Sequence, residues 1–136
     1  MTISITALRA GAQTNLDTVA TFRTIYDYIP DTAPATPAAI VGNVTLEWDE
    51  ANQRGLDYAT FSVYVVVSRM SERSGQDTLD ALLAGSGSGS VKTALETGGT
   101  LNGSCATMRV TRATPISITM GGVDFFAYEY EVEAYG

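Results

Sequence analysis

The sequence predicts an α+β fold with a mainly antiparallel four-stranded sheet and helices packed on one face, in the order α-β-β-α-α-β-β. Three stretches repeat apolar residues at intervals of three or four, as amphipathic helices do. Four other stretches are expected to be strands, three with alternating apolar and polar residues and one with apolar residues on both faces, and a Gly-Gly pair marks a hairpin between two of them. The 136 residues correspond to a single domain, residues 1–136.

The first expected element is a helix from about Ser4 to Val19 whose apolar residues share one face. These residues are Ile5, Leu8, Ala12, Leu16 and Val19. Residues 21–30 are rich in β-branched and aromatic side chains, so we expect an extended segment, with a helix continuing to Tyr28 as the alternative. The proline-containing residues 31–37 are expected to form a surface loop.

Two strands are expected next. Val44, Leu46 and Trp48 alternate with polar residues, which predicts a strand with one buried face. The polar residues 49–60 separate it from a second strand over residues 61–68. Both faces of this second strand are apolar, so it is expected to lie inside the sheet.

The middle of the chain predicts two short helices joined by a glycine-rich turn. Ser74 can cap the first helix, three leucines give it an apolar face, and Gly85 can end it. The leucines are Leu79, Leu82 and Leu83. Ser88 or Ser90 can cap the second helix, which ends at Gly98-Gly99. Its apolar residues are Val91, Ala94 and Leu95.

Two more strands complete the expected sheet. Residues 106–113 form the first, and a two-residue turn at Gly121-Gly122 follows, because glycine tolerates the positive φ that such a turn needs. In the last strand, Glu129, Glu131 and Glu133 share one face, since strand side chains alternate. The other face carries Phe126, Tyr128, Tyr130, Val132 and Ala134.

The composition narrows the range of functions. Fifteen acidic and eight basic residues give a net charge of −7, which disfavours free binding to nucleic acid. Histidine is absent, and with it the commonest general base and most zinc sites. The single cysteine, Cys105, is expected to be a small buried residue. Without a signal-like or membrane-spanning segment, we expect the chain to be made and used without crossing a membrane.

The stretch LLAGSGSGSVKTALE invites comparison with a phosphate-binding loop. A P-loop follows a strand and places its lysine directly after the last glycine. Here two residues separate Gly89 from Lys92, and the preceding element is a predicted helix. The stretch therefore predicts a helix–helix turn, and we expect neither a cofactor nor a metal in this protein.

The glutamate row, Glu129, Glu131 and Glu133, is the first candidate functional feature. In one interpretation it is a solvated face or a cross-strand-paired one, with Arg109 and Arg112 opposite. In the other it is an acidic wall that faces a channel. Neighbouring carboxylates on one face of a strand lie roughly 7 Å apart, but the other parts of a catalytic site are missing from the pattern.

Two expected hairpin tips, residues 49–60 and 113–122, are the second candidate feature. Tips of this length are either simply mobile or arms that reach a neighbouring subunit. Apolar residues in a tip are unfavourable in water, which favours a contact. The candidate residues for contact with a neighbouring subunit or another partner are Arg54, Gly55, Asp57, Ile116, Ile118 and Met120.

Taken together, several segments resemble the tail terminator proteins of long non-contractile-tailed phages, most closely those from phages of actinobacteria. The segments are TIYDYIPDTAP, FSVYVVVSRMSERSGQDTLDALLAGSGSGSVKTALE, LNGSCATMRVTRA and the closing aromatic-acidic strand. The resemblance covers nearly the whole chain and is strongest from Val63 to Glu96.

The resemblance implies a structural virion protein in the neck region of the tail, assembled in the host cytoplasm. It would form a homo-hexameric ring that caps the head-proximal end of the tail tube, stops tube polymerisation and joins the tail to the head connector or stopper protein. Its partners would be the tail tube protein and that connector, with genomic DNA only as cargo through the lumen and no membrane contact. The glutamate row would then face the lumen.

Alternatives of the same structural class are a head–tail stopper or adaptor and a tail tube subunit. A small soluble enzyme or a ligand-binding module belongs to a different class. The missing histidine and the lack of a converging polar motif argue against an enzyme.

Overall fold

A computed structural model of the chain describes residues 4–19, 22, 24–26, 38–47, 57–69, 90–96, 99–101, 103, 105, 107–120 and 122–135. Its elements in chain order are α1 (Ile5–Leu16), β1 (Thr24–Tyr26), β2 (Ala38–Val41), β3 (Thr45–Glu47), β4 (Tyr58–Arg69), α3 (Val91–Glu96), β5 (Thr107–Met120) and β6 (Val123–Tyr135). The helix expected after Ser74 and the glycine run up to Gly89 lie outside the described residues.

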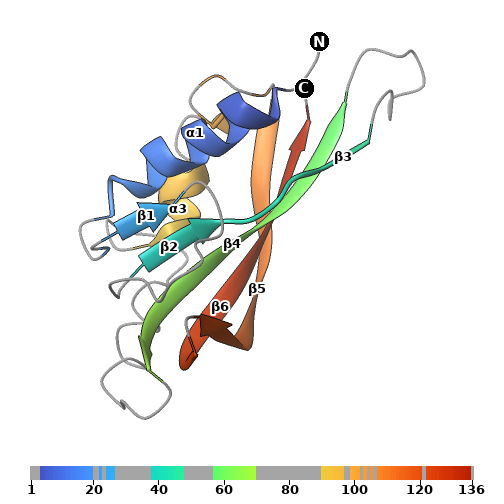
Figure 1. Cartoon of the computed structure of the whole chain (residues 1–136). Coiled ribbons are helices and arrows are strands. Elements are labelled where there is room, and N and C mark those ends of the chain that lie inside the picture. The colour runs from blue at the N-terminus through green and yellow to red at the C-terminus, as the bar shows by residue number, and fades with distance from the viewer. Residues whose placement is uncertain are drawn as a thin grey trace.

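The described strands form one mixed, mostly antiparallel sheet in the order β1-β2-β4-β6-β5, with β3 also pairing with β4. Only β1 and β2 pair in parallel. The long strands β4, β5 and β6 form a strongly twisted ribbon, and α1 and α3 lie on one side of it (Figure 1). The α+β class is therefore confirmed, whereas the expected four strands are too few, since the described residues contain six.

The two extra strands, β1 and β2, lie at one edge of the sheet. Residues 24–26 form β1, so the expected extended conformation is confirmed there, and α1 ends at Leu16, before this segment. Strand β2 was not predicted, because its four residues, AAIV, are all buried and lack the alternation that marks a strand. Strand β4 begins at Tyr58, three residues earlier than expected, within the segment read as a polar connection.

Strand β5 corrects the second expected hairpin tip. Residues 113–120 are not a loop but the second half of β5, paired with β6 up to Met120. The hairpin turn itself is confirmed, and Gly122 has a φ of +76°. A β-bulge between Val110 and Arg112 shifts the register, which explains how one strand can run for 14 residues along a strongly twisted partner.

Helix α1 begins as predicted. The side chain of Ser4 accepts a hydrogen bond from the backbone N–H of Ala7 at 3.3 Å, which satisfies one of the donors that a helix start leaves free. The helix ends at Leu16, three residues before the expected end, but Val19 still packs into the core with 2% of its surface exposed. The buried Nδ2 of Asn15 donates to the carbonyl of Leu95 at 3.1 Å and so ties α1 to α3.

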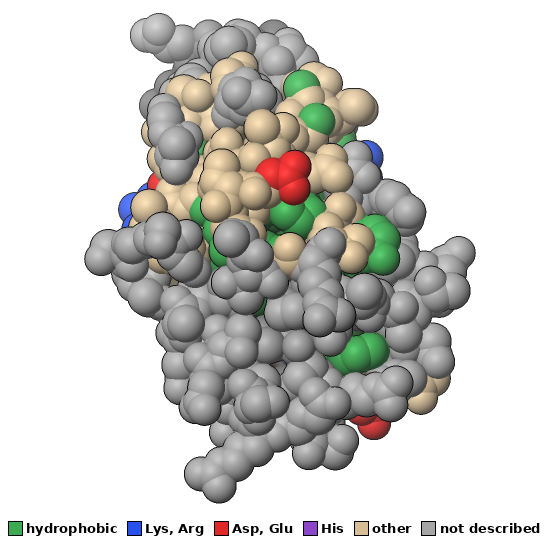
Figure 2. Space-filling model, turned by 90° about the vertical axis from the view of Figure 1, so that its left-hand side faces the viewer, with side chains coloured by type: hydrophobic (Ala, Val, Ile, Leu, Met, Phe, Trp, Pro, Cys, Tyr) green, Lys and Arg blue, Asp and Glu red, His purple; other side chains and the backbone are tan. Residues whose placement is uncertain are grey.

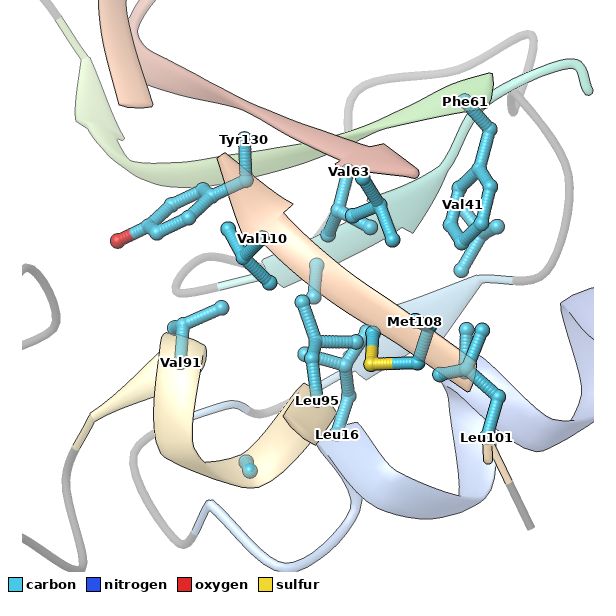
Figure 3. Packing of buried hydrophobic residues seen from close by; sticks show 14 of the residues in the cluster. Leu16, Val41, Phe61, Val63, Val91, Leu95, Leu101, Met108, Val110 and Tyr130 are labelled. Carbon is cyan, nitrogen blue, oxygen red and sulfur yellow. The ribbon is translucent and has the colours of Figure 1, made fainter. Parts of the chain in front are cut away.

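The main core lies between the two helices and the sheet (Figure 3). Leu16 and Leu95 come from the helices and face Met108 and Val110 of β5, while Val63 lies on the neighbouring part of the sheet. Residue Cys105 is buried in this core, as expected, with 3% of its surface exposed.

A second, smaller apolar cluster lies on the other face of the sheet. Val65 belongs to the main core and Val66 to the second cluster, as the alternation of a strand requires. The buried members of the second cluster are Ile40, Val66, Phe125 and Ala127, and its partly buried members are Tyr26, Tyr64, Ile116 and Ile118.

Candidate functional site

The glutamate row lies on the face of the sheet opposite α1 and α3, as the alternation predicted. Glu129, Glu131 and Glu133 point away from the main core, while their neighbours Tyr130 and Val132 are buried in it. We call this surface the glutamate face; besides the row it carries Tyr58, Thr60, Ser62, Tyr64, Arg109 and Arg112. It is therefore built from the three long strands of the sheet.

Two of the three glutamates form ion pairs with the neighbouring strand. Arg112 Nε lies 2.6 Å from Glu131 Oε2, and Arg109 Nε lies 3.4 Å from Glu133 Oε2. Both arginine side chains are 71% exposed, so each pair contributes roughly 0–1 kcal/mol to stability. The interpretation of a cross-strand-paired face is thus confirmed, and the row is not a bare acidic wall.

Tyrosines on β4 hold the carboxylates from the other side. The hydroxyl of Tyr58 donates to Glu133 Oε1 at 2.9 Å, and its ring lies 4.9 Å from that of Tyr135, centroid to centroid. Burial, then the charge of Glu129 and a hydrogen bond to it, raise the pKa of Tyr64 above its ordinary value. Every glutamate of the row therefore has at least one polar partner within the chain.

Raising the pH from about 10 to about 12 is expected to destabilise the fold, in part through Tyr58. Burial, followed by the hydrogen bond to Glu133 and the charge of that carboxylate, raises the pKa of Tyr58 to about 12, whereas an unfolded tyrosine titrates near about 10. Between these values the folded chain holds the proton and the unfolded chain does not, so stability falls as the pH rises. Urea unfolding at both ends of this range should show a smaller loss in Tyr58→Phe, and an equal loss in both proteins would contradict the assignment.

A polar hollow of about 270 Å³ lies on the glutamate face beside the junction of β2 and β3. Its lining consists of Asn43, Thr45, Thr60, Phe61, Ser62, Tyr64 and Glu131. The backbone N–H of Gly42 donates to the carbonyl oxygen of Ser62 at 2.8 Å, and a Cβ at Gly42 would lie only 2.9 Å from that oxygen. Glycine thus lets the junction lie close to β4. The hollow was not predicted, because β2 was not.

The tip of the β5–β6 hairpin brings together the two candidate isoleucines. Ile116 and Ile118 are partly buried and pack against the cluster that contains Phe125 and Ala127. Met120 is the last residue of β5 and pairs with Val123. Ile116 and Ile118 therefore cover part of the chain's own second cluster and keep part of their surface exposed.

The remaining candidate contact residues are Arg54, Gly55 and Asp57. Arg54 and Gly55 lie outside the described residues. Asp57 is described and has only 6% of its surface exposed, so it is part of the folded subunit and presents little surface to a partner. The structure does not bring Asp57 together with the isoleucines of the hairpin tip.

The end of the glycine-rich stretch is a helix start, as expected. The side chain of Ser90 accepts a hydrogen bond from the backbone N–H of Thr93 at 3.2 Å and caps α3. Lys92 Nζ lies 2.6 Å from Glu96 Oε1, one turn further along the same helix. The lysine is therefore engaged in a local ion pair.

Glu96 makes a second contact that no sequence pattern predicted. Its Oε2 accepts a hydrogen bond from the backbone N–H of Val110 in β5 at 2.9 Å. Burial by itself would raise the pKa of Glu96, but the hydrogen bonds from Lys92 and from this N–H outweigh burial and lower it. The carboxylate is thus held in its charged form against the edge of the sheet.

The described residues hold no group of three histidine, cysteine or acidic side chains arranged to bind a metal ion. On the side of the molecule seen in Figure 2, the described part shows few charged side chains, among uncharged side chains, backbone and small apolar patches. Among the described helices, none has the length and apolarity needed to span a membrane.

A scan against models of protein families found no match to this chain, and a search of curated proteins found none either.

Proposed function

We propose that this chain is a structural phage protein, a tail terminator that forms a hexameric ring on the head-proximal end of the tail tube. The ring stops tube polymerisation and joins the tail to the head connector or stopper protein. The proposal draws on the resemblance carried by the segments from Val63 to Glu96 and by the closing strand. It makes the protein a binding component without catalytic activity, present in the neck of the virion after assembly in the host cytoplasm.

The observation that best supports the proposal is the hairpin of β5 and β6. These strands are 14 and 13 residues long, while α1 and α3 pack near only part of their length (Figure 1). Ile116 and Ile118 lie in the distal half, and each keeps exposed apolar surface. A closed ring needs heterologous contacts, in which one patch of a subunit meets a different patch on the next. The hairpin tip provides such a patch.

In the proposed ring the glutamate face lines the lumen through which the genome passes. Next to this face, Glu47 of β3 pairs with Tyr58, so the described side chains here include four carboxylates against the guanidinium groups of Arg109 and Arg112. The ion pairs of Glu131 and Glu133 reduce the repulsion of DNA, so Glu129 and Glu47 supply most of it. A weakly acidic wall of this kind lets a duplex pass without binding it.

Imaging of the virion tests the proposal. Cryo-electron microscopy of phage particles that contain this chain is expected to show six copies in one ring between the head connector and the tail tube. Copies along the whole tube would identify a tube subunit instead. A position inside the head connector would identify a stopper or adaptor, and particles without the chain would exclude a structural role in the virion.

A further inference from the structure

Strand β5 is the last strand of the described sheet, with β6 on one side and no described strand on the other (Figure 1). An edge strand of 14 residues exposes a row of backbone donors and acceptors, which is a template for pairing with another chain. A second copy of the chain that offers the same edge could pair with it and form a dimer. Three features of β5 bear on whether its edge is open.

The first feature is the contact between Glu96 and Val110. The N–H of Val110 donates to Glu96 Oε2 at 2.9 Å, so this N–H points outward from the sheet and not toward β6. The carboxylate takes the position that a carbonyl of an added strand would occupy. Lys92 holds the carboxylate from α3 at 2.6 Å, which fixes its position.

The second feature is Pro115, in the middle of the strand. In an antiparallel pair the N–H groups of successive residues point alternately toward the partner strand and away from it. Val110 pairs with Val132, and Pro115 pairs with Tyr128. These two partners lie four residues apart on β6, and because four is an even number, the nitrogens of Val110 and Pro115 both face outward. Proline has no N–H, and the register on both sides of it is unbroken. The edge therefore lacks its donor at this position.

The third feature lies between these two positions. The β-bulge between Val110 and Arg112 puts Thr111 out of register, and its hydroxyl donates to the carbonyl of Glu131 at 3.2 Å. By the same alternation, Ala113 has the one outward N–H between the capped Val110 and Pro115. A strand added here would find one donor where a regular edge offers three.

We propose that the middle of β5, residues 110–115, is a closed part of the edge, which prevents a second copy of the chain from pairing along β5. The side chain of Glu96, the bulge at Thr111 and the ring of Pro115 close it together. The inference goes beyond the proposed function and does not depend on it. If the chain forms a ring, its subunits meet through surfaces other than this edge, such as the hairpin tip.

The test restores the edge in the full chain. The double variant Glu96→Ala/Pro115→Val frees the N–H of Val110 and supplies one at position 115. Sedimentation velocity over a range of concentrations is expected to show a new species of twice the mass of the wild-type species. A nitroxide attached at Thr114→Cys reports the pairing directly, because two paired β5 strands bring their labels close enough for dipolar broadening. The same label in the wild-type background is expected to show no broadening.

Two matched variants separate the edge from other effects. Glu96→Gln keeps an oxygen that accepts from Val110, and it is expected to leave the edge closed when Pro115 is intact. Ser117→Val adds apolar surface to the same strand without changing its donors, and it is expected to behave as the wild type. If Ser117→Val associates as strongly as the double variant, apolar surface is responsible and the proposal is overturned.

The proposal is also overturned if the wild-type label is broadened, or if the folded double variant keeps the wild-type mass at every concentration. If circular dichroism shows that the double variant does not fold, Pro115→Val alone decides the question. It leaves the Glu96 contact in place and is expected to give a smaller fraction of the doubled species. A wild-type mass for this single variant then overturns the proposal.

Discussion

Replacing Leu95 with alanine is expected to lower the free energy of unfolding by about 3 kcal/mol. Leu95 is fully buried in the same core cluster as Leu16 of α1 and Met108 of β5 (Figure 3). Helix α3 has six residues, too few to be stable by itself, so it depends on this packing. Loss of the side chain leaves a cavity between the helices and the sheet. Equilibrium unfolding in urea, followed by circular dichroism, measures the change.

Lys92→Ala is the control for this prediction, because it changes the same helix on its exposed side. Its side chain is 46% exposed and makes an ion pair with Glu96, so we expect a change of a few tenths of a kcal/mol. A loss in Leu95→Ala no larger than that in Lys92→Ala would mean that α3 does not depend on the core.

The second large effect is expected at the hairpin tip. The double variant Ile116→Asp/Ile118→Asp should fold but lose the ability to form rings on the ends of tail tubes. Both side chains are partly exposed at the edge of the second cluster, where a carboxylate can still reach water in the free subunit. In an interface, the same carboxylates would be buried without a partner, which costs several kcal/mol. Negative-stain electron microscopy of purified protein mixed with tubes measures the fraction of capped ends.

Ser117→Asp serves as the matched control, since Ser117 is exposed and lies between the two isoleucines in sequence but on the other face of β5. It adds charge to the same tip without touching the apolar patch, and we expect capping close to the wild-type level. If Ser117→Asp abolishes capping while the isoleucine variant does not, the contact lies on the opposite face of the hairpin.

Patterns confined to one strand or one turn predicted the structure well. The alternation in β6 placed Glu129, Glu131 and Glu133 on one face, and Gly121-Gly122 located the hairpin turn. The ion pairs with Arg109 and Arg112 also followed, because opposite charges on neighbouring strands were already visible in the sequence. The helix start at Ser90 was predicted for the same reason, since a cap is a local feature.

Features that depend on the sheet as a whole were missed. The four buried residues of β2 do not alternate, because this strand packs on both faces between β1 and β4. Residues 113–122 were expected to be a hairpin tip, but residues 113–120 continue β5; Pro115 fits there because an edge strand tolerates proline where the nitrogen faces outward. The contact of Glu96 with Val110 joins residues 14 apart on a helix and a strand, and no spacing rule marks such a pair.

The length of the tail in the absence of this protein tests the central claim most directly. A phage from which the gene is deleted should produce tails of irregular, excessive length that are not joined to heads, because tube polymerisation then has no cap. Expression of the wild-type chain from a plasmid should restore normal length and joining. Tails of normal length attached to heads in the deletion strain would contradict the proposal that this protein terminates the tail.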